Sequence, residues 1–124
     1  MPDTLARSKQ AYSAARGTIK TPRSVEYEAL AGITARMRSA SEKGSAGFSD
    51  LASALHENRR IWTVFAVESA DEANQLPLEL RAGIVSLAGF VQQHSSKVLA
   101  RSGAIEPLLD VNTAIMRGLR GGGN

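Results

Sequence analysis

The sequence lacks cysteine altogether and contains only six aromatic residues among its 124. The absence of cysteine excludes disulfide bonds, thiol nucleophiles and cysteine-ligated metals, and it is typical of proteins in a reducing compartment. Because 43% of the residues are nevertheless hydrophobic, the core must be built mainly from aliphatic side chains. Packed helices suit such a composition.

Residues that usually carry chemistry are equally scarce. The two histidines, His56 and His94, lie far apart and have no His-x-x-x-His or Glu-x-x-His spacing that would hold a metal ion. No nucleophile stands beside a base, and no glycine pair is followed by the lysine of a phosphate-binding loop. We therefore expect a protein that is not an enzyme and needs neither metal nor cofactor.

Long hydrophobic runs are missing too. The most apolar stretch, residues 84–91, has eight residues, whereas a membrane-spanning helix requires about 20. Asp3, Arg7 and Lys9 interrupt the opening stretch, and no apolar core of a signal peptide follows them. These features predict a cytoplasmic protein without a membrane segment.

Basic charge is concentrated at the N-terminus. The net charge is +3, but residues 1–23 contain five cations and one acid, +4, so the remainder carries −1. If all five cations met phosphates, log K would fall with log salt with a slope of about −4 to −5, which describes modest, non-specific binding. A nucleic-acid role is therefore the less favoured alternative.

Apolar residues recur at helical spacing between short breaks. A chain of this length fits one domain, and we predict an all-α, single-domain bundle of about five amphipathic helices over residues 1–120. Residues 121–124 form a glycine-rich tail that we expect to be disordered. The predicted helices begin near Thr4, Pro22, Ser49, Pro77 and Glu106, and the clearest breaks lie at residues 17–22, 44–47 and 70–77.

Each of the last four helices has a predicted core stripe. Thr21 is the expected N-cap of the helix that starts at Pro22. The stripes comprise Ala29, Leu30, Ile33, Met37 and Ala40; Leu51, Leu55, Trp62, Phe65 and Ala66; Leu80, Ile84, Leu87, Ala88, Val91, Val98 and Leu99; and Leu108, Leu109, Ile115, Met116 and Leu119.

Polar side chains interrupt three of these stripes. Asn58 and Asn112 stand at the centres of otherwise apolar faces, and Glu26 falls on the stripe of its helix, where it should have a cationic partner. A buried asparagine costs free energy unless it is hydrogen-bonded, although it can fix register or partner choice. We favour an arrangement in which these residues bond to one another, or to Glu26, inside the bundle. The alternative is that some of them face a bound helix.

Other features indicate a surface for a partner. Ile61, Val64 and Val67 lie off the main stripe of their helix, so that helix is either central in the bundle or reserves a side for a partner, and we favour the central position. Two glycines interrupt the next helix, Gly83 and Gly89. Such positions usually accompany close packing of another backbone, and the alternative is that they simply weaken the prediction of a helix there. The predicted partner-binding residues are Arg59, Arg60, Trp62, Gly83 and Phe90, with aromatic and small residues as the floor and arginine as the rim.

Several short motifs resemble the FlaF family of flagellar biosynthesis regulators, over residues 11–119. No single motif is decisive, but their order and spacing make coincidence improbable. The matching pieces are Thr21-Pro22-Arg23 with Glu26-Tyr27, Asn58-Arg59-Arg60 with Trp62, Leu76-Pro77 with Leu80-Arg81-Ala82, Ile84 with Ser86-Leu87, His94, and Glu106-Pro107-Leu108 with Asn112 and Gly118-Leu119.

The resemblance implies a cytoplasmic factor needed for the production and export of flagellin. It would bind flagellin as a secretion chaperone, by covering the amphipathic ends of flagellin in a helical groove. Alternatively, it would act with FlbT as a post-transcriptional regulator of flagellin mRNA, or as a scaffold that bridges FlbT and flagellin. The glycine-rich stretch at residues 44–47 and the C-terminal tail depart from the family pattern.

Overall fold

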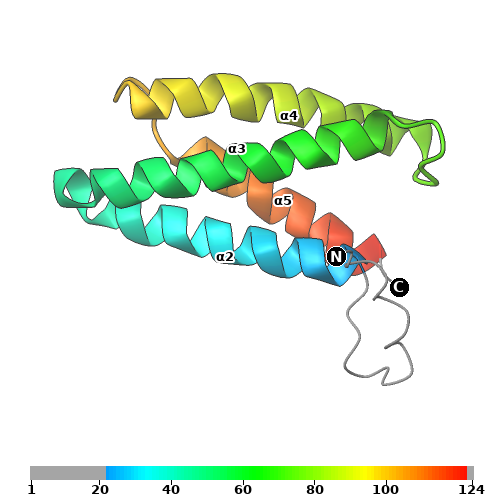
Figure 1. The fold of residues 1–124 in the computed structure, drawn as a ribbon, viewed down its shortest axis with the longest axis horizontal. Coiled ribbons are helices and arrows are strands. Elements are labelled where there is room, and N and C mark those ends of the chain that lie inside the picture. The colour runs from blue at the N-terminus through cyan, green and yellow to red at the C-terminus, as the bar shows by residue number, and fades with distance from the viewer. Residues whose placement is uncertain (1–21, 123–124) are drawn as a thin grey trace, which may run out of the picture.

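The computed structural model describes residues 22–122, and this part of the chain is all-helical (Figure 1). The first predicted helix, at residues 4–16, lies outside the described residues, as do residues 123–124 of the predicted tail. The elements are α2 (Pro22–Glu42), a 3-10 turn η2 (Gly44–Gly47), α3 (Phe48–Ala70), α4 (Leu78–Leu99) and α5 (Glu106–Gly122).

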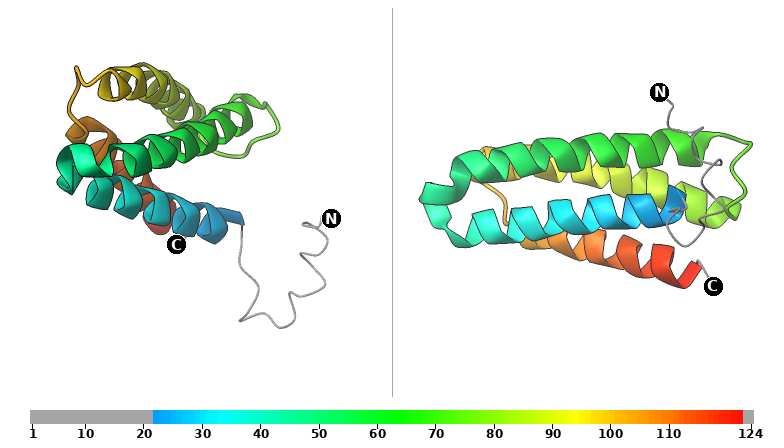
Figure 2. Two further views of the ribbon diagram at one scale, coloured as in Figure 1. Left: turned by 60° about the vertical axis from the view of Figure 1, so that its left-hand side comes forward. Right: turned by 60° about the horizontal axis from the view of Figure 1, so that its bottom comes forward.

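Consecutive helices run in opposite directions, and α3 lies between α2 and α4 (Figures 1 and 2). It packs along α2 on one side and along α4 on the other, while the backbones of α2 and α4 do not come close to each other. The last helix, α5, packs mainly against α2 and meets α4 at few residues. Both α2 and α3 are therefore inner helices, but Val64 and Val67, two of the residues that suggested a central position for α3, are exposed. The four described helices form an all-α bundle in which α4 and α5 make few contacts.

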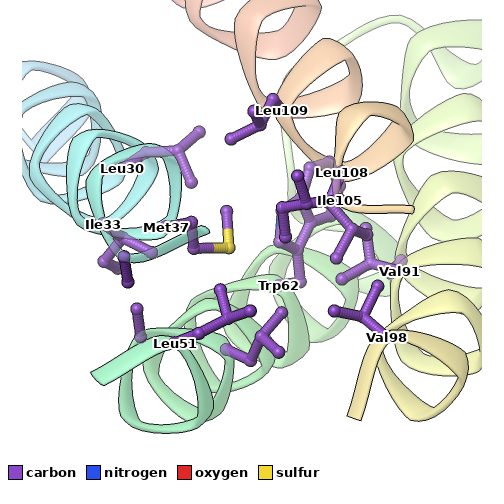
Figure 3. Close-up of a cluster of buried hydrophobic side chains, with 14 of the residues drawn as sticks. Leu30, Ile33, Met37, Leu51, Trp62, Val91, Val98, Ile105, Leu108 and Leu109 are labelled. Carbon is purple, nitrogen blue, oxygen red and sulfur yellow. The ribbon is translucent and has the colours of Figure 1, made fainter. Parts of the chain in front are cut away.

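The core is aliphatic around a single tryptophan (Figure 3). Trp62 is fully buried, and the ring of Phe65 meets it edge-on with centroids 5.3 Å apart. Aliphatic side chains from all four helices surround this pair, among them Leu30, Met37, Leu55, Val91 and Leu108.

The turn between α2 and α3 depends on glycine at two positions. Gly44 has φ of 61°, a left-handed conformation that side chains rarely adopt. Gly47 is buried against the end of α2, where an added Cβ would collide with the carbonyl oxygen of Ala40. The glycines at 44–47 therefore allow α2 and α3 to pack closely through a very short connection.

Most predicted helix boundaries and core positions are confirmed. The first described helix starts at Pro22 and the last begins at Glu106, although α5 continues to Gly122, beyond the end that we predicted. Two core assignments were wrong. Ala29 is exposed, and Thr34 instead occupies the buried stripe of α2; Leu80 is exposed because no helix covers it.

A buried polar network joins α2, α3 and α5. The side-chain oxygen of Asn112 accepts a hydrogen bond from Trp62 Nε1 at 2.8 Å. Its Nδ2 donates to Asn58 Oδ1 at 2.8 Å and to Thr34 Oγ1 at 2.9 Å. The Thr34 hydroxyl in turn donates to the carbonyl oxygen of Leu30 at 2.7 Å. The predicted bond between the two asparagines is thus confirmed, and Asn112 bonds to three side chains on two other helices.

Replacing Asn112 tests how much this network stabilises the fold. Asn112→Ala removes the acceptor of the buried Trp62 N–H and the donor to Asn58, and a buried polar group left unpaired costs about 1–3 kcal/mol. We expect the free energy of unfolding to fall by about 2–4 kcal/mol, measured by urea denaturation followed by circular dichroism. Ala114→Ser, at an exposed position of the same helix, should change it by less than about 0.5 kcal/mol. Equal behaviour of the two variants would contradict a stabilising role for the network.

Candidate partner-binding surface

The helices α4 and α5 diverge from their connection. They are close where the chain passes from one to the other, and α5 then runs toward the start of α2 (Figures 1 and 2). Because α5 meets α4 at few residues, the N-terminal half of α4 is not covered on the side that faces α5. We call the side of α4 that faces α5, beyond these few contacts, the seam.

One face of α4 along this seam is apolar and accessible. Leu80, Gly83, Leu87 and Phe90 follow one another at intervals of three, four and three residues, which places them on one face of a helix. Leu80 is 47% exposed and Phe90 is 39% exposed, Leu87 is half-buried, and Gly83 is exposed. We call these four residues the α4 strip.

The seam is closed at the C-terminal end of the α4 strip. His94 stacks on Phe90 with ring centroids 5.3 Å apart, and its Nε2 lies 2.7 Å from the carbonyl oxygen of Ala104. The connection packs tightly there, because a Cβ on Gly103 would come within 2.8 Å of Lys97 Cβ. The α4–α5 connection therefore bounds the α4 strip at Phe90, whereas the other end of the strip, at Leu80, is uncovered.

The opposite wall of the seam is supplied by α5. In the core, Leu109 points toward Leu30 of α2, whereas Leu108 lies on the side of Val91 of α4 (Figure 3). Val111 and Ile115 share the face of Leu108 by helical spacing, and both are half-buried hydrophobic residues packed against the core. The face of α5 that carries Leu108 is thus apolar, as the α4 strip is.

A second apolar patch lies on the outer side of the α3–α4 hairpin. Leu78 and Val85 share the face of α4 on which Arg81 contacts α3, through its bond to the Ser69 carbonyl at 2.7 Å. Both side chains are exposed, as is that of Val67 on α3, which is 66% exposed. We call Val67, Leu78 and Val85 the outer patch, and it is separated from the α4 strip by the buried stripe of α4.

The predicted site residues do not form one surface. Gly83 and Phe90 lie together on the α4 strip, as expected. Trp62 was wrongly assigned, because it is fully buried and its N–H is bonded to Asn112.

The two arginines predicted as the polar rim differ from each other. The guanidinium of Arg59 is not available to a partner, because it donates to the Gln92 carbonyl at 2.7 Å and to Ser96 Oγ at 2.6 Å and so joins α3 to α4. Arg60 points to solvent, 69% exposed, with only a long 3.8 Å pairing to Glu57.

Sequence analysis missed Leu80 and Leu87 as surface residues. Both continue the apolar spacing of the α4 core stripe, so the sequence assigns them to the interior. Whether such a position is covered depends on the path of a different helix, α5, and no local signal in α4 carries that information. The expected cationic partner of Glu26 stays a prediction; its side chain is half-buried in the first turns of α2.

The glycines of α4 do not pack against another backbone. A Cβ added at either Gly83 or Gly89 would meet no atom within 4 Å, so the predicted close packing at these two positions is wrong for the described residues. We expect Gly83→Ala and Gly89→Ala each to raise the free energy of unfolding by about 0.5–1 kcal/mol, because alanine loses less conformational entropy in a helix. Thermal or urea denaturation measures this, with Gly47→Ala as the destabilised comparison. A destabilising Gly83→Ala would reveal a contact at that position.

Within residues 22–122, no group of three His, Cys, Asp or Glu side chains is arranged to hold a metal ion. No helix in the same range is both long enough and apolar enough to span a bilayer.

The fold and the α4 strip together define the class of protein: a small all-helical bundle in which apolar side chains of α4 stay accessible. The family model for the flagellar protein FlaF matches residues 8–119 of this chain. The chain therefore belongs to the FlaF family of flagellar proteins, as its sequence motifs predicted. No curated protein and no solved structure matches it.

Proposed function

We propose that this protein is a cytoplasmic, non-enzymatic flagellar assembly factor that binds flagellin and promotes its synthesis and export. Membership of the FlaF family supports a flagellar role. The observation that carries the binding role is the α4 strip, whose large apolar side chains Leu80 and Phe90 stay accessible in the folded chain.

The geometry of the strip suits an amphipathic helix as the guest. A docking helix presents apolar anchors at i, i+3, i+4 and i+7, and the α4 strip repeats at intervals of three, four and three residues. The ends of flagellin are long amphipathic segments of this kind. Covering their apolar faces in the seam would keep flagellin from assembling before export.

Substitutions in the α4 strip test this proposal directly. Leu80→Ser combined with Phe90→Ser removes two apolar anchors, and truncating central anchors of an interface commonly costs at least about tenfold in affinity. We expect the unchanged chain to retain purified monomeric flagellin in a pull-down. The double variant should bind it at least about tenfold more weakly by calorimetry.

The matched control is Val67→Ser combined with Val85→Ser, which removes two exposed apolar side chains from the outer patch instead. It should bind flagellin as the unchanged chain does, and circular dichroism confirms that each variant is folded. If the unchanged, folded chain retained no flagellin, the proposed function would be wrong. If only the control variant lost binding, the site would lie on the outer patch.

A pair of glycine substitutions distinguishes contact from stability. Gly83→Leu places a bulky side chain on the α4 strip, and Gly89→Leu places the same side chain on another face of α4. An added Cβ meets no atom within 4 Å at either position. Both should be at least as stable as the unchanged chain, since leucine favours helix. We expect only Gly83→Leu to weaken flagellin binding, by about tenfold, in the same calorimetric titration. Equal binding by both would place Gly83 outside the contact.

The outer patch favours one alternative, a scaffold that bridges FlbT and flagellin. Two apolar surfaces on different faces of α4 would allow two proteins to bind at once. Gel filtration of the three purified proteins tests it: a ternary complex that Val67→Ser with Val85→Ser dissolves, while the flagellin complex persists, would support the scaffold. A regulator of flagellin mRNA would instead depend on the cations of residues 1–23, and its RNA binding would fall steeply with salt.

A further inference from the structure

The end of the α3–α4 hairpin is acidic. Residues 64–84 contain four acids and one cation, a net charge of −3. Arg81, the single cation, is directed to the carbonyl oxygen of Ser69 at 2.7 Å. The four acids, Glu68, Asp71, Glu72 and Glu79, are all exposed, and they lie in the last turn of α3, the α3–α4 connection and the first turn of α4, the end of the hairpin at which the α4 strip begins with Leu80.

The first described helix, α2, begins at the same end of the bundle. Because α2 and α3 are antiparallel, α2 begins where α3 ends, and Figure 1 shows both ends on the same side of the molecule. The residues before Pro22 are therefore joined to the bundle at its acidic end. Residues 1–23 carry +4, a charge opposite in sign to that of the hairpin end.

We propose that the chain's own residues 4–16 dock as an amphipathic helix on the α4 strip, and that a guest segment must displace them. Their apolar side chains, Leu5 and Tyr12, lie seven residues apart on one helical stripe. A helix of this length is about 20 Å long, and the strip from Leu80 to Phe90 measures about 15 Å along α4. The segment is thus long enough to cover the whole strip.

The length of the connection to α2 limits how far the segment can reach. Residues 17–21 span up to about 16 Å when extended, which exceeds the spacing of about 8–10 Å between neighbouring helices. Because α2 and α4 are not neighbours, the connection has to run nearly extended past the end of α5. A segment that reaches the seam from this end runs antiparallel to α4, with Arg16 and Lys20 beside the acids and Leu5 toward Phe90. In this arrangement the cations of the segment face the acids of the hairpin end, and the apolar side chains of the segment face the rest of the α4 strip.

Tethering favours this occupant over a second copy of the chain. A segment joined by a short connection has an effective concentration in the millimolar range, far above that of a free partner at micromolar concentration. A guest therefore binds only as far as it outcompetes the tethered segment. That part of the proposal rests on the proposed function, since it takes flagellin as the guest.

Hydrogen exchange of the full-length protein tests the docking. The unchanged chain is compared with Leu5→Ser combined with Tyr12→Ser, and with Gln10→Ser combined with Ala14→Ser as a control on the opposite side of the segment. We expect residues 80–90 to exchange at least about threefold faster in the first variant and at the unchanged rate in the control. Raising salt from about 0.1 to 1 M, which shortens the Debye length from about 10 to 3 Å, should speed exchange in the unchanged chain.

Two results would overturn the docking: equal exchange in the three proteins, or protection of residues 80–90 that grows with protein concentration, which would mean a second copy. Flagellin titration then separates this proposal from the proposed function. Tighter binding of flagellin by Leu5→Ser with Tyr12→Ser supports displacement, and unchanged binding refutes it. If no variant binds flagellin while exchange still differs, the docking stands and the proposed function fails.

Discussion

The hydrogen bonds of Asn112 determine where the last helix lies. Its amide accepts from Trp62 and donates to Asn58 and Thr34, so α5 is joined to α2 and α3 at the centre of the core. Any rotation of α5 toward α4 would leave buried polar groups without partners, at about 1–3 kcal/mol each. A single buried asparagine therefore opposes closure of the bundle on its fourth side.

The other side of the seam is fixed by bonds between α4 and α3. Arg59 donates to the Gln92 carbonyl and to Ser96, and the Gln92 amide donates back to the Arg59 carbonyl at 3.2 Å. Arg81 adds a bond at the opposite end of the hairpin. The α4 helix is held mainly against α3, whereas α5 packs mainly against α2 and bonds to α3 only through Asn112. The two walls of the seam are therefore held by different contacts, and Leu80 and Phe90 stay accessible.

The sequence predicts local features well and relative placement poorly. Helix starts at Pro22 and Glu106, the aliphatic core and the bond between Asn58 and Asn112 follow from periodicity, capping and the need to pair buried amides. Leu80 and Trp62 show the limit. Both stand on apolar stripes, yet one is exposed and the other fully buried, because exposure depends on the path of α5 past α4. Arg59 was likewise misassigned, since its partners lie on another helix and its spacing does not reveal them.

An accessible apolar strip is useful to a binding protein and hazardous to it, because exposed apolar surface promotes association with unintended partners. A bundle that buried Leu80 and Phe90 permanently would avoid the hazard but could not receive a guest without unfolding. A rigid core with a removable cover meets both needs. The α4 helix contributes its own buried stripe to the core, and Leu80 and Phe90 lie beside that stripe, so the core forms without covering them. The proposed docking of residues 4–16 would cover the strip reversibly, with an affinity set by few contacts and weakened by salt.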